Sequence, residues 1–276
     1  VDNYNWTIND RGQARNCGVE DSIPFITTWK TDNPGVSNSD QITIPTYESQ
    51  PWEEVLVYDY NIDWGDGTID SHVSSTITHT YDSPGTYTVS ITGEFPRIYF
   101  ENFNAEKDNE KLLTVEQWGN YGWSSMQSAF YKCINLDVKA EDIPNFKWVD
   151  NISQMFYGCS SLIGNETINQ WETQNVREIS NWDVSNVEYM SEVFKSNTKF
   201  NQDISSWDVS SVKDMSGVFN GATNFNKDIS IWDVSKVTYM SYLFNDASSF
   251  NQNVGNWNIS AVANMYAIFD YSGISN

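Results

Sequence analysis

FNQDISSWDVSSVKDMSGVFNGATN occupies residues 200–224, and FNKDISIWDVSKVTYMSYLFNDASS follows at once at residues 225–249. Four series of residues keep this period of 25: Trp182, Trp207, Trp232 and Trp257; Met190, Met215, Met240 and Met265; Phe194, Phe219, Phe244 and Phe269; and Phe200, Phe225 and Phe250. A constant period of this length is the sequence signature of a repeat architecture. One unit cannot bury its own apolar side, so we expect stacked units with a continuous core.

The period extends toward the N-terminus in a weaker form. Phe130 and Phe156 are 26 residues apart, and the next Phe of the series, Phe194, follows only after 38. The longer step predicts an irregular coil near residues 163–180.

The apolar spacing inside a unit predicts its local structure. Ile204, Trp207, Val209 and Val212 are spaced as in the strand of a leucine-rich repeat, and Met215, Val218 and Phe219 follow at helix-like spacing. We therefore expect a short strand plus a helical or 3-10 turn in each unit. Neighbouring units would then form a parallel sheet on one face of a solenoid, with the helical turns on the other face.

The units resemble the repeats of BspA-type leucine-rich-repeat bacterial surface proteins, which read W-D-V-S-x-V-x-x-M-x-x-x-F. The matching residues are Trp207, Asp208, Val209, Ser210, Val212, Met215 and Phe219, with their copies in flanking units. The resemblance covers about 125–270. It implies a leucine-rich-repeat solenoid and a role in adhesion or interaction at a cell surface.

A second resemblance precedes the repeats, in YNIDWGDGTIDSHVSSTITHTYDSPGTYTVSIT at residues 60–92. Its DWGDGT and HTY stretches and its later PGTYTV stretch are similar to a PKD-type domain, which implies an immunoglobulin-like β-sandwich. Such domains are spacers or adhesion modules and are not themselves catalytic. We expect Asp63 and Asp66 to bond backbone amides in a turn. His79 is expected to pack and hydrogen-bond inside the sandwich.

These resemblances predict a mainly β chain with short helices. The predicted parts are an N-terminal linker or flap at 1–21, a PKD-like β-sandwich at 22–103, a junction and cap at 104–124, and the solenoid at 125–276. The cap is expected because terminal repeats need an altered outer face.

The charge and residue composition of the chain argue against several classes of partner. The 276 residues include 37 Asp plus Glu and 15 Lys plus Arg, a net charge of −22. Such a charge argues against contact with nucleic acid or an anionic membrane surface. No apolar run approaches the length of a membrane span, so no membrane insertion is predicted. Three cysteines and two histidines predict neither a disulfide scaffold nor a zinc site.

The candidate ligand-binding residues are polar series that keep the period of 25. They are Asp183, Asp208, Asp233 and Asn258, one residue after each Trp; Ser210 and Ser235; and Tyr189 and Tyr239. The residue after an inward strand position points outward, so we place these side chains on the open face of the expected sheet. Stacked carboxylates suit Ca²⁺ or a polar ligand. The alternative is that each Asp accepts hydrogen bonds from neighbouring Ser hydroxyl and backbone N–H groups.

The Trp series and two of the cysteines are interpreted as parts of the core. The Trp series is a candidate sugar-binding strip, but its leucine-type position favours the core, where each indole N–H needs a partner. Cys133 and Cys159 fall in one small slot of adjacent units, which favours stacked core thiols over a disulfide.

We therefore predict a non-catalytic secreted or cell-surface protein, located outside the cell, that binds a glycan or protein partner through an extended solenoid face. Further domains of the same chain are additional candidate partners. No cofactor is predicted, and Ca²⁺ stays an open alternative. Catalysis is disfavoured because the repeats contain no His to serve as a base for the Ser series. Two other roles stay open: a structural component of a surface fibre or larger assembly, and a non-catalytic appendage of a secreted polysaccharide-degrading enzyme.

Overall fold

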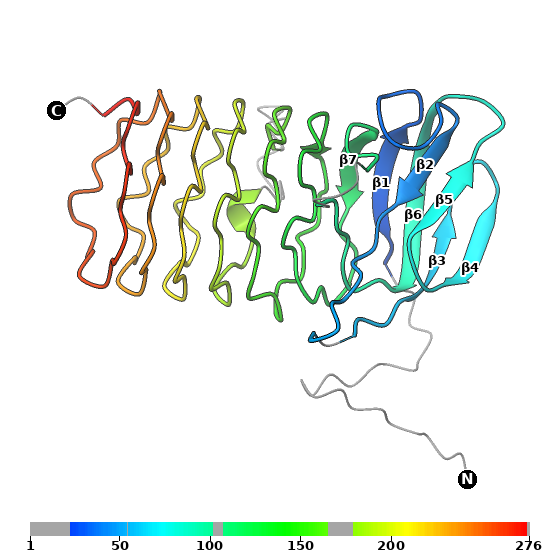
Figure 1. The fold of residues 1–276 in the computed structure, drawn as a ribbon, viewed down its shortest axis with the longest axis horizontal. Helices are drawn as coiled ribbons and strands as arrows, with labels where there is room; N and C mark the ends of the chain where they lie inside the picture. Colours follow the sequence, from blue (N-terminus) through cyan, green and yellow to red (C-terminus); the bar gives the residue numbers. More distant parts are fainter. Residues whose placement is uncertain (1–22, 54, 102–106, 165–178, 275–276) are drawn as a thin grey trace, which may run out of the picture.

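The computed structural model describes residues 23–53, 55–101, 107–164 and 179–274. The predicted flap at 1–21 and most of the predicted irregular coil near 163–180 lie outside these residues. Figure 1 shows two sheets at one end of the molecule and a row of stacked chain turns that extends from them toward the C-terminus.

The N-terminal part of the described chain consists of β-strands. They are β1 (Phe25–Lys30), β2 (Gln41–Ile44), β3 (Asp59–Asp63), β4 (Ile69–Val73), β5 (Ile77–Thr80) and β6 (Thr86–Glu94). One mixed sheet has the order β4-β3-β6-β1-β7-β8, and β2 and β5 form a separate antiparallel pair. Alternate residues of β1 are buried, as expected for a strand with one face on a core.

The larger sheet continues into the repeats through β7 (Leu112–Gln117) and β8 (Asp137–Val138). β1 pairs antiparallel with β7, and β7 pairs parallel with β8. The buried side chains of the sheets and of the repeats form one hydrophobic cluster. The repeat stack therefore begins on a paired strand of the N-terminal sheet.

A buried ion pair fixes this connection. Lys111 and Asp108 are fully buried, 3.8 Å apart, just before β7. Lys111 Nζ donates to the carbonyl oxygens of Ser37, Asn38 and Gln41, and Asp108 accepts from the backbone N–H of Ser37. The charges are buried together with hydrogen-bond partners, which is the condition under which a buried pair is tolerated.

Each repeat unit is a chain of successive β-turns. In the unit that begins near Ile204, five N–H groups donate to the carbonyl three residues earlier, at 2.9–3.3 Å: Trp207 to Ile204, Val212 to Val209, Val218 to Met215, Ala222 to Phe219 and Phe225 to Ala222. The residues at these turn corners are apolar and buried. The residues between the corners are mostly Ser, Gly, Asn and Thr, which favour turns.

The predicted fold class, a β-sandwich followed by a leucine-rich-repeat solenoid with a parallel sheet and short helical turns, is wrong. Beyond β8 no strand lies in the described part of the chain, and the only helix there is the 3-10 helix η1 (Ile179–Asn181). Neighbouring units share single parallel bridges, such as Tyr189 with Asp214. The apolar spacing of three, interpreted as strand and helix, is the spacing of turn corners.

Aromatic rings form the core of the stack. Phe194, Phe219, Phe244 and Phe269 lie nearly parallel, with successive centroids 5.6–6.0 Å apart. The Trp series is buried, as predicted. The indole N–H of Trp207 donates to the carbonyl of Ile179 in the preceding unit, at 2.9 Å, and Trp232 and Trp257 repeat this bond. Cys133 and Cys159 are buried free thiols, which confirms that prediction.

One core position departs from the repeat. Ala222 and Ala247 fill a small buried slot three residues after the Phe, whereas the unit before them has Asn197 there. The Asn197 side chain is fully buried, and among the described residues neither of its polar atoms has a hydrogen-bond partner. An unsatisfied buried amide destabilises a fold.

Replacing Asn197 with Ala is therefore expected to stabilise the protein. The gain from removing the unsatisfied amide, offset in part by lost packing, should be about 1 kcal/mol in the free energy of unfolding. Chemical denaturation measures it. The reverse change in the next unit, Ala222→Asn, is the matched control and should destabilise. A loss of stability in N197A would show that the amide is satisfied in solution, for instance by a bound water.

Candidate functional site

The predicted Asp series lies at β-turns. Asp208 and Asp233 are exposed, and Oδ1 of each accepts the N–H of the Ser two residues later at 3.0 Å. Asp183 and Asn258 make the same bond to Ser185 and Ser260. Hydrogen bonds from the side chain and then the backbone of Ser210 and Ser235 lower the pKa of Asp208 and Asp233. The series thus has a local structural role, and ligand binding by it stays a prediction.

Tyr189 and Tyr239 lie in a different row. Parallel bridges connect Asn151, Tyr189, Asp214, Tyr239 and Asn264 in successive units. Both tyrosines are exposed. In the chain this row is six residues after the Asp series, so the structure separates the predicted site into two rows.

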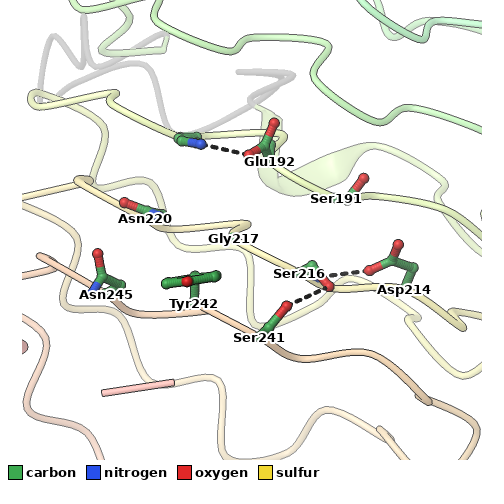
Figure 2. Close-up of a pocket in the computed structure, with 10 residues that line it drawn as sticks. Ser191, Glu192, Asp214, Ser216, Gly217, Asn220, Ser241, Tyr242 and Asn245 are labelled. Carbon is green, nitrogen blue, oxygen red and sulfur yellow. Dashed lines mark hydrogen bonds and ion pairs between the residues drawn. The ribbon is translucent and has the colours of Figure 1, made fainter. Parts of the chain in front are cut away.

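A polar pocket lies beside the bridged row. It encloses about 480 Å³ and spans three successive units. Figure 2 shows Tyr242 and Glu192 on either side of Gly217. The lining residues are Ser191, Ser216 and Ser241; Asn220 and Asn245; Glu192, Lys195, Asp214, Gly217 and Tyr242.

The pocket arises at a position whose side chain differs from unit to unit. This variable position holds Ser128, Gln154, Glu192, Gly217, Tyr242 and Ala267 in successive units, and all six have φ between 54° and 62°. The left-handed conformation is therefore imposed by the turn and is accepted by several residue types. Because Gly217 has no side chain, it opens the row between Glu192 and Tyr242.

Hydrogen bonds along the variable position fix one wall of the pocket. Ser128 Oγ lies 3.0 Å from Gln154 Oε1, and Gln154 Nε2 donates to Glu192 Oε2 at 2.9 Å. Glu192 Oε1 accepts from Lys195 Nζ at 2.5 Å, and Lys195 also lies over the Tyr157 ring. Both Glu192 oxygens are thus engaged, which positions this carboxylate at the edge of the gap.

Other lining groups are available to a ligand. Asp214 Oδ1 accepts from the Ser216 N–H at 2.8 Å, whereas Oδ2 has no hydrogen-bond partner among the described residues. The Asn220 side-chain amide likewise has none within the described ranges. These atoms can accept or donate hydrogen bonds to a molecule in the pocket.

The series that stay constant from unit to unit do not lead to this pocket, because the pocket arises where the units differ. Of the pocket residues, none was predicted, although Tyr189 and Tyr239 flank Asp214 in the bridged row. The informative signal in the sequence is a position that varies from unit to unit. The variable position changes from Glu192 to Gly217, Tyr242 and Ala267 between constant Met and Phe residues, which indicates a position outside the core.

The DWGDGT stretch forms the expected turns. Asp63 Oδ1 accepts the Gly65 N–H, and Asp66 Oδ1 accepts the Thr68 N–H, both at 2.9 Å. His79 stacks on Trp64 with centroids 4.6 Å apart, and its Nε2 lies 2.8 Å from Asp66 Oδ2. These contacts confirm the structural interpretation of the Asp residues and His79.

Within the described ranges, no group of three or more His, Cys, Asp and Glu side chains is arranged to hold a metal ion. The same residues include no helix that is both long and apolar enough to span a bilayer.

Comparison with known families gives two matches. Residues 124–181 and 177–276 match the family described as "Mycoplasma protein of unknown function, DUF285", and residues 54–96 match the PKD domain. The PKD match confirms that domain and lies inside the predicted range of 22–103; no leucine-rich-repeat family matches. No curated protein and no solved structure matches the chain. Both family matches are consistent with a surface-type protein.

The Asp66 contacts generate a prediction about acid stability. Burial raises the pKa of Asp66, but hydrogen bonds from Thr68 and His79 outweigh it and lower the pKa to about 2, from 3.8. A lowered pKa in the folded state stabilises the fold above the unfolded value, and this contribution is lost as pH falls from about 4 toward 2. The stability difference between the wild type and Asp66→Asn should therefore shrink over that window, as measured by denaturation at several pH values.

The control is Asp82→Asn, at an exposed carboxylate three residues after His79. It should leave the slope of stability against pH close to that of the wild type. A D66N slope indistinguishable from the wild type between pH 4 and 2 would contradict the assigned hydrogen bonds.

Proposed function

The chain belongs to the DUF285 family, and we propose that it is a non-catalytic binding protein of the cell surface or the extracellular space. Its partner would be a glycan or an extended protein, held on the polar side of the stacked repeat units. The observation that carries the proposal is the pocket at Gly217, which is lined almost entirely by polar side chains.

The backbone around the pocket supports a binding role. Met215, Gly217, Phe219 and Gly221 each donate an N–H to a carbonyl of the next unit, at 2.8–2.9 Å. These bonds hold the lining segments side by side at a fixed spacing. Rigid presentation lowers the entropy that binding must overcome, so several weak polar contacts can sum to useful affinity.

The carboxylates of the pocket are positioned by their neighbours. Glu192 is engaged by Lys195 and Gln154 through its two oxygens. Asp214 uses one oxygen for the Ser216 N–H and keeps the other for a ligand. An Asp with one free oxygen can accept a hydrogen bond from a ligand hydroxyl.

Location outside the cell follows from the same proposal. A net charge of −22 suits a protein that remains soluble and monomeric among other surface molecules. The PKD domain and the resemblance of the repeats to BspA-type surface proteins point the same way. Further domains of a longer chain, where present, would attach this module to a surface.

The test is binding of the purified chain to an array of extracellular polysaccharides and matrix proteins. We expect at least one ligand, whose binding falls about tenfold or more in the double variant Asp214→Asn, Asn220→Ala. The Asn at 214 keeps the turn bond, because Asn264 accepts the Tyr266 N–H in the same way.

The matched control is the double variant Asp208→Asn, Asp233→Asn, in which the turn bond is kept as it is at Asn258. It should bind like the wild type. Loss of binding in the control alone would move the site to the predicted Asp series, and loss on adding a chelator would bring in Ca²⁺. If the array shows no ligand, with or without the chelator, the proposal is contradicted.

A further inference from the structure

The geometry points to a subsite for one neutral pyranose ring of a glycan chain at Gly217, and this inference rests on the proposed function. The missing side chain at Gly217 leaves a gap with an aromatic ring on one side and a carboxylate on the other. The ring is that of Tyr242, and the carboxylate is that of Glu192.

The gap is a local interruption of a regular row. A Cβ atom built on Gly217 would lie 3.3 Å from Glu192 Cγ, a close contact, and 3.8 Å from Asn220 Cβ. The Glu192 side chain therefore lies directly beside the glycine backbone. The enclosed space of about 480 Å³ is within the range of small-molecule sites, about 300–1,000 Å³.

Tyr242 supplies the apolar part of the site. Its side chain is 42% exposed, and its ring makes an edge contact with Tyr266 of the next unit at a centroid distance of 5.4 Å. The contact orients the ring while its remaining surface stays accessible. An aromatic face with a polar tip suits the C–H face of a sugar ring, whose hydroxyls project around its edge.

The rest of the lining selects a polyhydroxy ligand. Asp214 Oδ2 can accept a hydrogen bond, and the Asn220 amide can donate and accept, as sugar hydroxyls require. Ser241 Oγ donates to Ser216 Oγ at 3.3 Å and keeps its acceptor capacity for a ligand. Glu192 and Asp214 disfavour a phosphate or a nucleic acid. A sugar without an anionic group therefore suits this lining.

The test is saturation-transfer NMR with six free sugars: glucose, galactose, mannose, fucose, N-acetylglucosamine and N-acetylgalactosamine. A single ring should bind with a Kd on the order of millimolar, which this method detects. We expect transfer to at least one sugar, reduced about tenfold or more in Gly217→Gln and in Tyr242→Ala.

Gly217→Gln is a conservative way to fill the gap. Gln154 and Glu192 occupy the same position of their own units with φ of 58° and 57°, so the backbone of this turn accepts a Gln. The Glu192 side chain must shift by a few tenths of an ångström to admit the new Cβ atom. Gly158→Gln introduces the same residue at another left-handed glycine, outside the pocket. Tyr271→Ala removes an exposed tyrosine that does not line it. Both controls should keep the wild-type transfer.

The outcomes separate this inference from the proposed function. No transfer to any sugar, or transfer that persists in both pocket variants, overturns the subsite. If the array shows a protein partner while free sugars give no transfer, the binding role stands and the sugar subsite fails. If the array and the sugars are both negative, both proposals fail.

Discussion

The backbone hydrogen bonds between units are the constraint on which the repeat region depends. In each unit, N–H groups at alternate residues donate to the next unit, as Gly217 does to Ser241 and Phe219 does to Leu243. Consecutive β-turns alone would not align one unit on the next, because the hydrogen bond of each turn closes only a short ring within its own unit. The inter-unit bonds align the turns, and alignment places each Phe ring over the next, 5.6–6.0 Å away.

This alignment also explains how side-chain rows form on the surface. Since successive units superpose at a period of about 25 residues, one chain position yields one row of side chains. At the variable position, Gln154 reaches Glu192 across 38 residues of sequence. Gly217 has no side chain to continue this row of hydrogen bonds. The next side chain at the variable position is that of Tyr242, on the far side of the gap. A pocket here needs no special loop, because one missing side chain in an ordered row creates it.

The sequence predicted the contents of the core more accurately than the path of the backbone. The Trp, Met and Phe series follow from a strict period, because inward positions must stay alike when units stack. They are buried except in the last unit, where Met265 is exposed and Phe269 is partly buried. Backbone conformation was misassigned because a spacing of three suits a helix, a curved strand and a β-turn alike. The deciding signal lay between the apolar residues. Ser205, Ser206, Ser210 and Ser211 are turn formers, and helix or strand interiors disfavour such a density of Ser.

The candidate site was harder to predict because it depends on differences between units. The Asp208 series is constant since its carboxylate closes a turn in each unit, and a constant polar residue of this kind indicates structure as readily as binding. The variable position, in contrast, holds a different side chain in each unit. Its left-handed conformation is the same for Glu192, Gly217 and Tyr242, so the backbone imposes no choice of side chain there. Where the frame leaves the side chain free, ligand recognition can determine it, and a change of specificity would then require no change in the fold.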